Sequence, residues 1–110
     1  MNITKDTIKG LTVLRCVGRL DATTSIKLEN EINALLDSEI NKVLIDFSGV
    51  DYLSSAGMRL LLSMTKRLKN KRGKLSIFAI HEEVREIINM AGFEKVLAIY
   101  STEEEAIKGL

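Results

Sequence analysis

The chain has 110 residues, of which 45% are hydrophobic and 28% are charged, and its formal net charge at pH 7 is +1. This length suits one globular domain, and the near-neutral charge gives no overall electrostatic case for a nucleic-acid partner. A single cysteine excludes an internal disulfide framework, the apolar runs are too short to cross a bilayer, and the first residues lack the order of a signal peptide. We therefore expect a cytoplasmic domain with no membrane or nucleic-acid partner.

The N-terminal segment predicts a β-hairpin. Residues 2–8 fit an edge strand, whereas residues 11–17 are β-branched and apolar on both alternating faces, as in an inner strand. Lys9-Gly10 is the expected turn, because glycine tolerates positive φ, and Gly18 is expected to end the second strand.

A helix and a buried strand are expected next. Apolar residues recur at helical spacing over residues 24–37, and either Asp21 or Thr23 can cap this helix by accepting a free backbone N–H. The short apolar run at residues 42–47 predicts a buried parallel strand, because it is too short for a helix and has suitable flanks.

The rest of the chain alternates between helices and strands. Residues 55–70 have an apolar face at helical spacing, and their basic C-terminal end stops at Gly73, as the helix dipole and the usual glycine cap favour. The remaining expected elements are a strand at 74–79, a helix at 82–91, a strand at 96–99 and a terminal helix that starts in a capping box at Ser101 or Thr102.

The resulting order, β-β-α-β-α-β-α-β-α, predicts a single α/β domain over residues 1–110. Its sheet is expected to be mixed but mostly parallel, with about four or five strands and about four helices. Regulatory and ligand sites of such sheets usually lie beyond the carboxyl ends of the strands. Ser54 and Ser55 follow the strand that is predicted to end at Phe47, so they lie at such a position.

These two serines allow several interpretations. Ser54 can simply cap the helix at 55–70. A nucleophilic serine would need a base and an orienting group, and the single histidine, His81, is placed at the start of another helix. No phosphate-binding loop string is present, but an exposed hydroxyl at a helix start can accept a phosphate from another enzyme. We expect no enzymatic activity, no cofactor and no metal site.

Other chemistry-bearing residues have plain structural interpretations. Asp21 is either a helix cap or an acid on a binding face, and Asp46 either ties down the loop with the serines or points to solvent at the end of its strand. We expect Cys16 in the core, His81 on the surface, and the basic residues 66–72 at a solvated helix end.

Several strings resemble one known family. Gly18 to Asp21 reads GRLD, Val43 to Leu62 reads VLIDFSGVDYLSSAGMRLLL, and the C-terminal half contains GKLSIFAI and then VREIINMAGFEKVLAIYSTEEEAI. Over nearly its whole length the chain resembles the STAS domains, and among them the stand-alone bacterial anti-sigma factor antagonists. The central string carries most of this resemblance, and the flanking strings support it.

The resemblance implies a mechanism of partner switching. The unmodified protein would bind an anti-sigma factor that is also a serine kinase, and so free the sigma factor; phosphorylation of one serine would break the complex, and a phosphatase would restore it. Aligned on Gly57, the acceptor is Ser55, with Ser54 as second choice in the family's acidic position and Ala56 in its second hydroxyl position. The implied partner-binding residues are Asp21, Thr23, Asp46, Ser54, Ser55, Gly57 and Met58.

An alternative within the same family is a STAS module that regulates a different partner. Such a partner would be a phosphatase, a stress-signalling scaffold or a lipid-transport complex. A pull-down separates the two functions, and a neighbouring gene for a serine kinase would favour the anti-sigma factor antagonist.

Overall fold

A computed structural model describes residues 1–110 and contains one five-stranded sheet with strand order β1-β2-β3-β4-β5. The first two strands pair antiparallel and the other neighbours pair parallel, so the predicted mixed sheet and element order are confirmed. The elements are β1 (Asn2–Ile8), β2 (Leu11–Leu20), α1 (Thr24–Asp37), β3 (Lys42–Leu53), α2 (Ser55–Asn70), β4 (Lys74–Phe78), α3 (Glu82–Met90), β5 (Ala98–Tyr100) and α4 (Glu103–Lys108).

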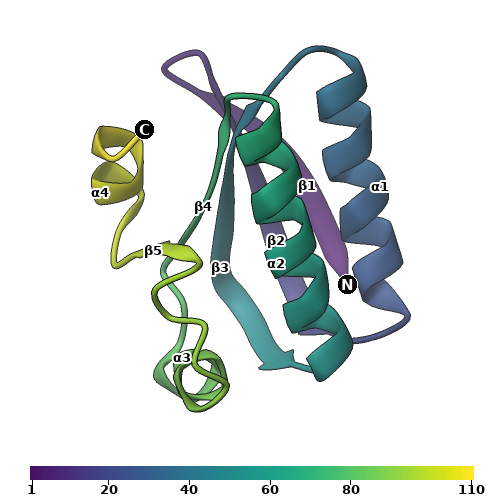
Figure 1. The fold of residues 1–110 in the computed structure, drawn as a ribbon, viewed down its shortest axis with the longest axis vertical. Coiled ribbons are helices and arrows are strands. Elements are labelled where there is room, and N and C mark those ends of the chain that lie inside the picture. The colour runs from purple at the N-terminus through teal and green to yellow at the C-terminus, as the bar shows by residue number, and fades with distance from the viewer.

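The helices cover the two faces of the sheet unequally (Figure 1). α1 and α2 lie side by side, and α3 lies near the end of the molecule at which both of them begin. All three pack on the main core, in which Leu14, Ile45 and Ile77 are neighbours across three strands and almost fully buried. α4 covers part of the opposite face, where Ala106 packs in a smaller apolar cluster. Hydrophobic burial on both faces therefore fixes the sheet between the helices.

β3 is longer than predicted. We expected the strand to end at Phe47, but it continues to Leu53. Its register with β2 shifts twice, so extra residues of β3 interrupt the simple alternation of buried and exposed side chains. Val50 and Leu53 still point into the core, whereas Asp51 is exposed. The segment that was interpreted as a loop is thus an irregular strand.

β2 also extends beyond its predicted end, to Leu20. Gly18 lies inside the strand with a φ of 120°, a conformation that side chains rarely tolerate. A Cβ atom at this position would lie 3.3 Å from the Cα of Met1, so the glycine also admits the N-terminus. It permits an irregularity within the strand and does not end it.

Three smaller differences concern the ends of later elements. β4 ends at Phe78, because Ala79 has a φ of 58° and leaves the strand conformation. α3 ends at Met90, one residue earlier than predicted, and Ala91 is exposed. β5 is shifted toward the C-terminus and spans Ala98–Tyr100.

Arg15 joins three carboxylates on the α4 side of the sheet. Its guanidinium lies 3.0 Å from Asp46, 2.9 Å from Glu103 and 3.3 Å from Asp6. Burial acts to raise the pKa of Asp46, but hydrogen bonds from the backbone N–H of Ser48, at 2.8 Å, and from Arg15 outweigh it and hold that pKa below its ordinary value. This Arg15 cluster ties the first three strands to α4.

Replacing Arg15 with Met should lower the free energy of unfolding at pH 7 by about 1.5 kcal/mol, because three partly buried carboxylates lose their shared cation. Folding lowers the pKa of Asp46. Its contribution to the free energy of unfolding is therefore present at pH values above its ordinary pKa of 3.8 and is lost as the pH falls through its pKa in the folded state. The difference from the natural protein should therefore shrink in acid. Urea unfolding at pH 7 and pH 3 measures both effects, with Lys5→Met on the exposed edge strand as control; equal losses in the two variants would contradict this role of Arg15.

Candidate functional site

The turn between β3 and α2 is fastened to the end of β2. Ser54 is the N-cap of α2, and its Oγ accepts a hydrogen bond from the backbone N–H of Gly57 at 3.1 Å. The backbone N–H of Ser54 donates to the carbonyl oxygen of Leu20 at 2.9 Å. The predicted cap is confirmed, and these two bonds fix the direction in which the first turn of α2 leaves the sheet.

Ser55 is the first residue of α2, and its side chain is exposed. No hydrogen bond joins its hydroxyl to another group of the protein, so the hydroxyl is free to meet an approaching molecule. It opens onto a hollow of about 210 Å³ between α2 and the chain that follows α3. We call this depression the Ser55 hollow. Its lining residues are Ser55, Met58, Arg59, Leu62, Ala91 and Phe93.

The turn between β2 and α1 lies next to this site, since Asp21 follows the residue that binds Ser54. The Asp21 carboxylate accepts hydrogen bonds from the backbone N–H groups of Thr24 and Thr23, both at 3.0 Å. These bonds hold the pKa of Asp21 below its ordinary value, and the bond from Thr24 has the largest effect. Thr23 occupies the N-cap position but makes no side-chain cap. Of the two predicted caps, Asp21 is therefore the one that acts.

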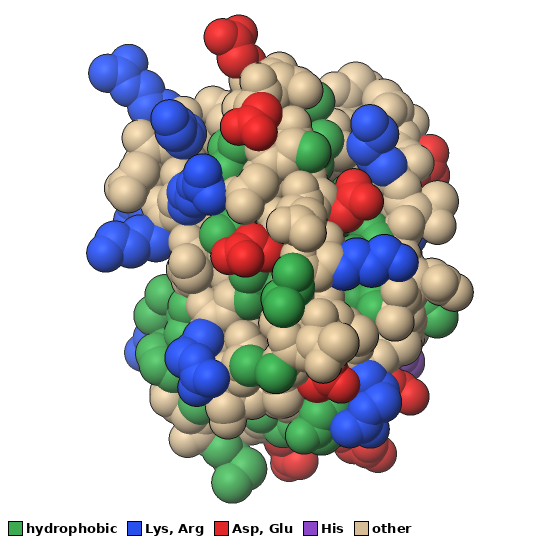
Figure 2. All heavy atoms as spheres, turned by 90° about the vertical axis from the view of Figure 1, so that its right-hand side faces the viewer, with side chains coloured by type: hydrophobic (Ala, Val, Ile, Leu, Met, Phe, Trp, Pro, Cys, Tyr) green, Lys and Arg blue, Asp and Glu red, His purple; other side chains and the backbone are tan.

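Exposed apolar and aromatic side chains lie at the same end of the molecule as these turns. Figure 2, in which the α1 side faces the viewer, shows hydrophobic side chains in the lower half, at the end where α1 and α2 begin. Ile26 in the first turn of α1 is 58% exposed, and Met90 at the end of α3 is 87% exposed. The Arg19 guanidinium lies 3.9 Å from the ring centre of Tyr52, a cation–π contact that holds this arginine against β3.

Comparison with known proteins identifies the family. Residues 2–106 match the family model described as the STAS domain. The chain belongs to the STAS family. BtrV of Bordetella bronchiseptica, assigned as an anti-sigma factor antagonist, is 30% identical over 106 residues, which are 96% of this STAS domain and 91% of BtrV. The anti-sigma-F factor antagonist RsfB of Mycobacterium tuberculosis is 27% identical over 101 residues, 92% of this chain and 82% of RsfB.

Solved structures share the fold of this STAS domain. An anti-sigma factor antagonist from Mycobacterium paratuberculosis superposes with a TM-score of 0.86 at 24% identity, covering 98% of this chain and 92% of that one. The Bacillus cell fate determinant SpoIIAA in its phosphorylated form gives a TM-score of 0.72 at 19% identity and covers 98% of each chain. At these identities the likeness establishes the fold.

Most of the residues that the sequence nominated lie at one end of the STAS domain. Asp21, Thr23, Ser54 and Ser55 belong to two turns that the Ser54–Leu20 hydrogen bond holds together. Gly57 and Met58 lie on the buried side of the first turn of α2, with Met58 only 7% exposed. These two residues therefore expose little area to an approaching molecule.

Asp46 does not join this group. It lies in the middle of β3 and binds Arg15 and the backbone of Ser48, so neither predicted role holds: it does not tie down the serine turn, and it does not point to solvent at a strand end. The prediction failed because the end of β3 was placed too early. Cys16 is in the core as expected, and burial, then the charge of Asp46, raises its pKa to about 12.

His81 lies on the surface, as predicted, and makes no hydrogen bond with Ser54 or Ser55. Its Nε2 is 2.6 Å from the carbonyl oxygen of Ser48, beside an acidic hollow of about 380 Å³ that Asp51, Glu82 and Glu83 help to line. No group of three or more histidine, cysteine or carboxylate side chains is placed to hold a metal ion. None of the helices has the length and apolarity that a membrane span requires.

The sequence analysis missed four members of the Ser55 hollow as site residues: Arg59, Leu62, Ala91 and Phe93. Arg59 could have been found, because residues four apart in a helix share a face and Arg59 is four residues after Ser55. Ala91 and Phe93 carry no such signal. Their place beside α2 depends on how α3 packs, which is a tertiary contact.

Replacing Ser54 with Ala should lower the free energy of unfolding by about 1 kcal/mol, because the N–H of Gly57 loses its side-chain acceptor. Ser55→Ala is the matched control. It removes an exposed hydroxyl without a partner and should change stability by less than about 0.5 kcal/mol. Urea unfolding of both variants measures the difference; if the adjacent substitutions cost the same, the assignment of the cap to Ser54 is wrong.

Proposed function

We propose that this STAS domain is an anti-sigma factor antagonist controlled by phosphorylation of Ser55. In its unmodified form it binds an anti-sigma factor that is also a serine kinase, and the sigma factor is released. The family assignment and the names of BtrV and RsfB support the antagonist role. The observation that carries the site is the free, exposed hydroxyl of Ser55 at the start of α2.

The choice of Ser55 over Ser54 rests on what each hydroxyl does. The Ser54 oxygen accepts a hydrogen bond from Gly57 and the residue is half-buried, so a kinase would have to break the helix cap to reach it. Ser55 has no such bond and is exposed. The phosphorylation of SpoIIAA, a protein with the same fold, agrees with a phosphate-controlled switch.

The modification is an ordinary phosphoryl transfer. The kinase passes the γ-phosphoryl group of ATP to the Ser55 oxygen, the hydroxyl proton leaves to a base of the kinase, and ADP is released. A phosphatase reverses the state by hydrolysing the phosphoserine to serine and inorganic phosphate. The substrate serine thus needs exposure and correct presentation, and the catalytic groups belong to the partner enzymes.

The proposed partner surface combines the two turns and the rim of the Ser55 hollow. Asp21 and Thr23 present polar groups at the start of α1, and the hollow offers an apolar depression beside Ser55. Asp46 is left out, because its carboxylate is committed to the Arg15 cluster. A partner that covers both turns would enclose the Ser55 hydroxyl, so that a phosphate there would lie inside the interface.

Mass spectrometry after incubation with the candidate kinase and ATP tests the site. The natural protein and Ser54→Ala should gain one phosphate, whereas Ser55→Ala should gain none. Modification that persists in Ser55→Ala and disappears in Ser54→Ala would transfer the site to Ser54. Absence of modification in all three proteins, together with no complex in a pull-down, would refute the antagonist function with this partner.

A further inference from the structure

Arg59 is an uncommitted cation beside the proposed acceptor serine. It is exposed on α2 and makes no hydrogen bond, ion pair or cation–π contact with the rest of the protein. By contrast, Arg19 stacks on Tyr52, and Arg67 in the last turn of α2 donates to Asn33. An unpaired guanidinium next to a hydroxyl that receives a phosphate is available to bind it.

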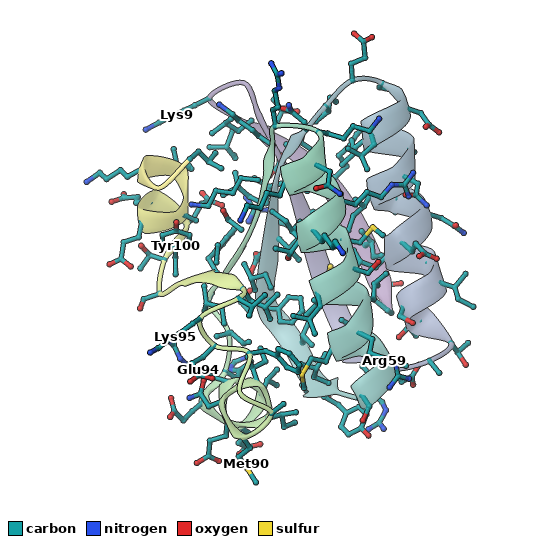
Figure 3. All side chains as sticks on the ribbon, viewed as in Figure 1. Lys9, Arg59, Met90, Glu94, Lys95 and Tyr100 are labelled. Atoms are coloured by element: carbon teal, nitrogen blue, oxygen red, sulfur yellow. The ribbon has the colours of Figure 1, made fainter.

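The geometry of α2 directs Arg59 toward Ser55. Residues four apart lie on the same face of a helix, and helical side chains lean toward the N-terminus, so the long side chain of Arg59 extends back over the first turn. Both residues line the Ser55 hollow. Figure 3 shows Arg59 at the end of α2 from which the helix begins, while Glu94 and Lys95 lie on the other side of α3 from α2 in this view.

We propose that Arg59 is the intramolecular partner of a phosphate on Ser55. This inference rests on the proposed phosphorylation of Ser55. A guanidinium offers two parallel N–H donors that match two phosphate oxygens, and such charge-assisted bonds are stronger than neutral ones. The phosphate would then engage the free arginine and hold its side chain across the Ser55 hollow. Phosphorylation would change the partner surface twice, by adding negative charge and by withdrawing a cation and covering apolar lining.

Phosphorus NMR of protein with genetically encoded phosphoserine at position 55 tests the pair without any kinase. Because a bound cation favours the dianion, the phosphate of the natural sequence should lose its second proton at a pH about half a unit lower than the phosphate of Arg59→Gln. Lys66→Gln removes one exposed charge from the same helix and should behave like the natural sequence. Identical titrations with and without Arg59 would overturn the proposal.

Phosphoserine encoded at position 54 provides a second comparison. Arg59 is five residues from Ser54, which places the two side chains on different faces of the helix, so Arg59→Gln should leave this titration unchanged. If the phosphate titrations at positions 54 and 55 both change equally with Arg59→Gln, the effect is a general one of charge and the specific pair is refuted. Failure of the kinase to modify Ser55 would instead refute the proposed function. Because the encoded phosphoserine needs no kinase, the NMR titration tests the Arg59 pair independently of that failure.

Discussion

A chain with phosphoserine at position 55 should bind its anti-sigma factor several hundredfold more weakly than the unmodified chain. The phosphate adds about 1.5–2 negative charges and three oxygens that must be hydrated. Ser55 is exposed in the free protein, so the fold can accept this group; the positive end of α2 even favours it by about 0.3–1 kcal/mol. In the complex the same group would be enclosed, and a cost of about 3–4 kcal/mol corresponds to the expected loss of affinity.

Calorimetric titration of the purified anti-sigma factor measures this effect. Ser55→Ala should bind about as tightly as the natural protein, since it adds neither charge nor bulk. Phosphoserine encoded at position 38, an exposed site at the far end of α1, is the matched control and should change affinity little. Unaltered thermal unfolding would show that the fold is intact. Equal affinities of the phosphorylated and unmodified proteins would contradict the switch.

The order of the elements could be predicted because each segment shows the period of its own structure. Leu28, Ile32 and Leu35 recur at helical spacing and are all buried on α1. The cap at Ser54 was also predictable, because a serine before an apolar helix commonly caps it and the donor to its hydroxyl oxygen, the backbone N–H of Gly57, is local. Local chemistry and periodicity therefore fix most of the fold and the position of the two serines.

The role of Asp46 could not be predicted, because it depends on the register of two strands. Asp46 lies opposite Arg15 only because β2 and β3 are parallel in that register. Two register shifts further along hide the alternation of β3, so the sequence analysis ended the strand at Phe47 and placed Asp46 near the end of that strand. The Ser55 hollow could not be predicted either, because Phe93 reaches α2 through packing between segments that are distant in the sequence.

Gly57→Ala should lower the free energy of unfolding by about 2 kcal/mol, although alanine is the better helix former by about 1 kcal/mol. The added Cβ would lie 2.7 Å from the carbonyl oxygen of Leu20 and 2.9 Å from its Cγ. A backbone oxygen cannot move aside as the end of a side chain can, so the first turn of α2 must shift outward. Packing therefore outweighs helix propensity at this residue.

The shift would also reach the proposed site. Ser54 and Ser55 lie on the same turn, and the Ser54–Leu20 hydrogen bond joins that turn to β2. Gly57→Ala should accordingly weaken anti-sigma factor binding under conditions in which the variant is still folded. Urea unfolding and calorimetric titration measure the two effects, with Ser63→Ala at an exposed position of α2 as control. A Gly57→Ala protein that is as stable as the natural one would show that propensity wins and that α2 does not need this close approach to β2.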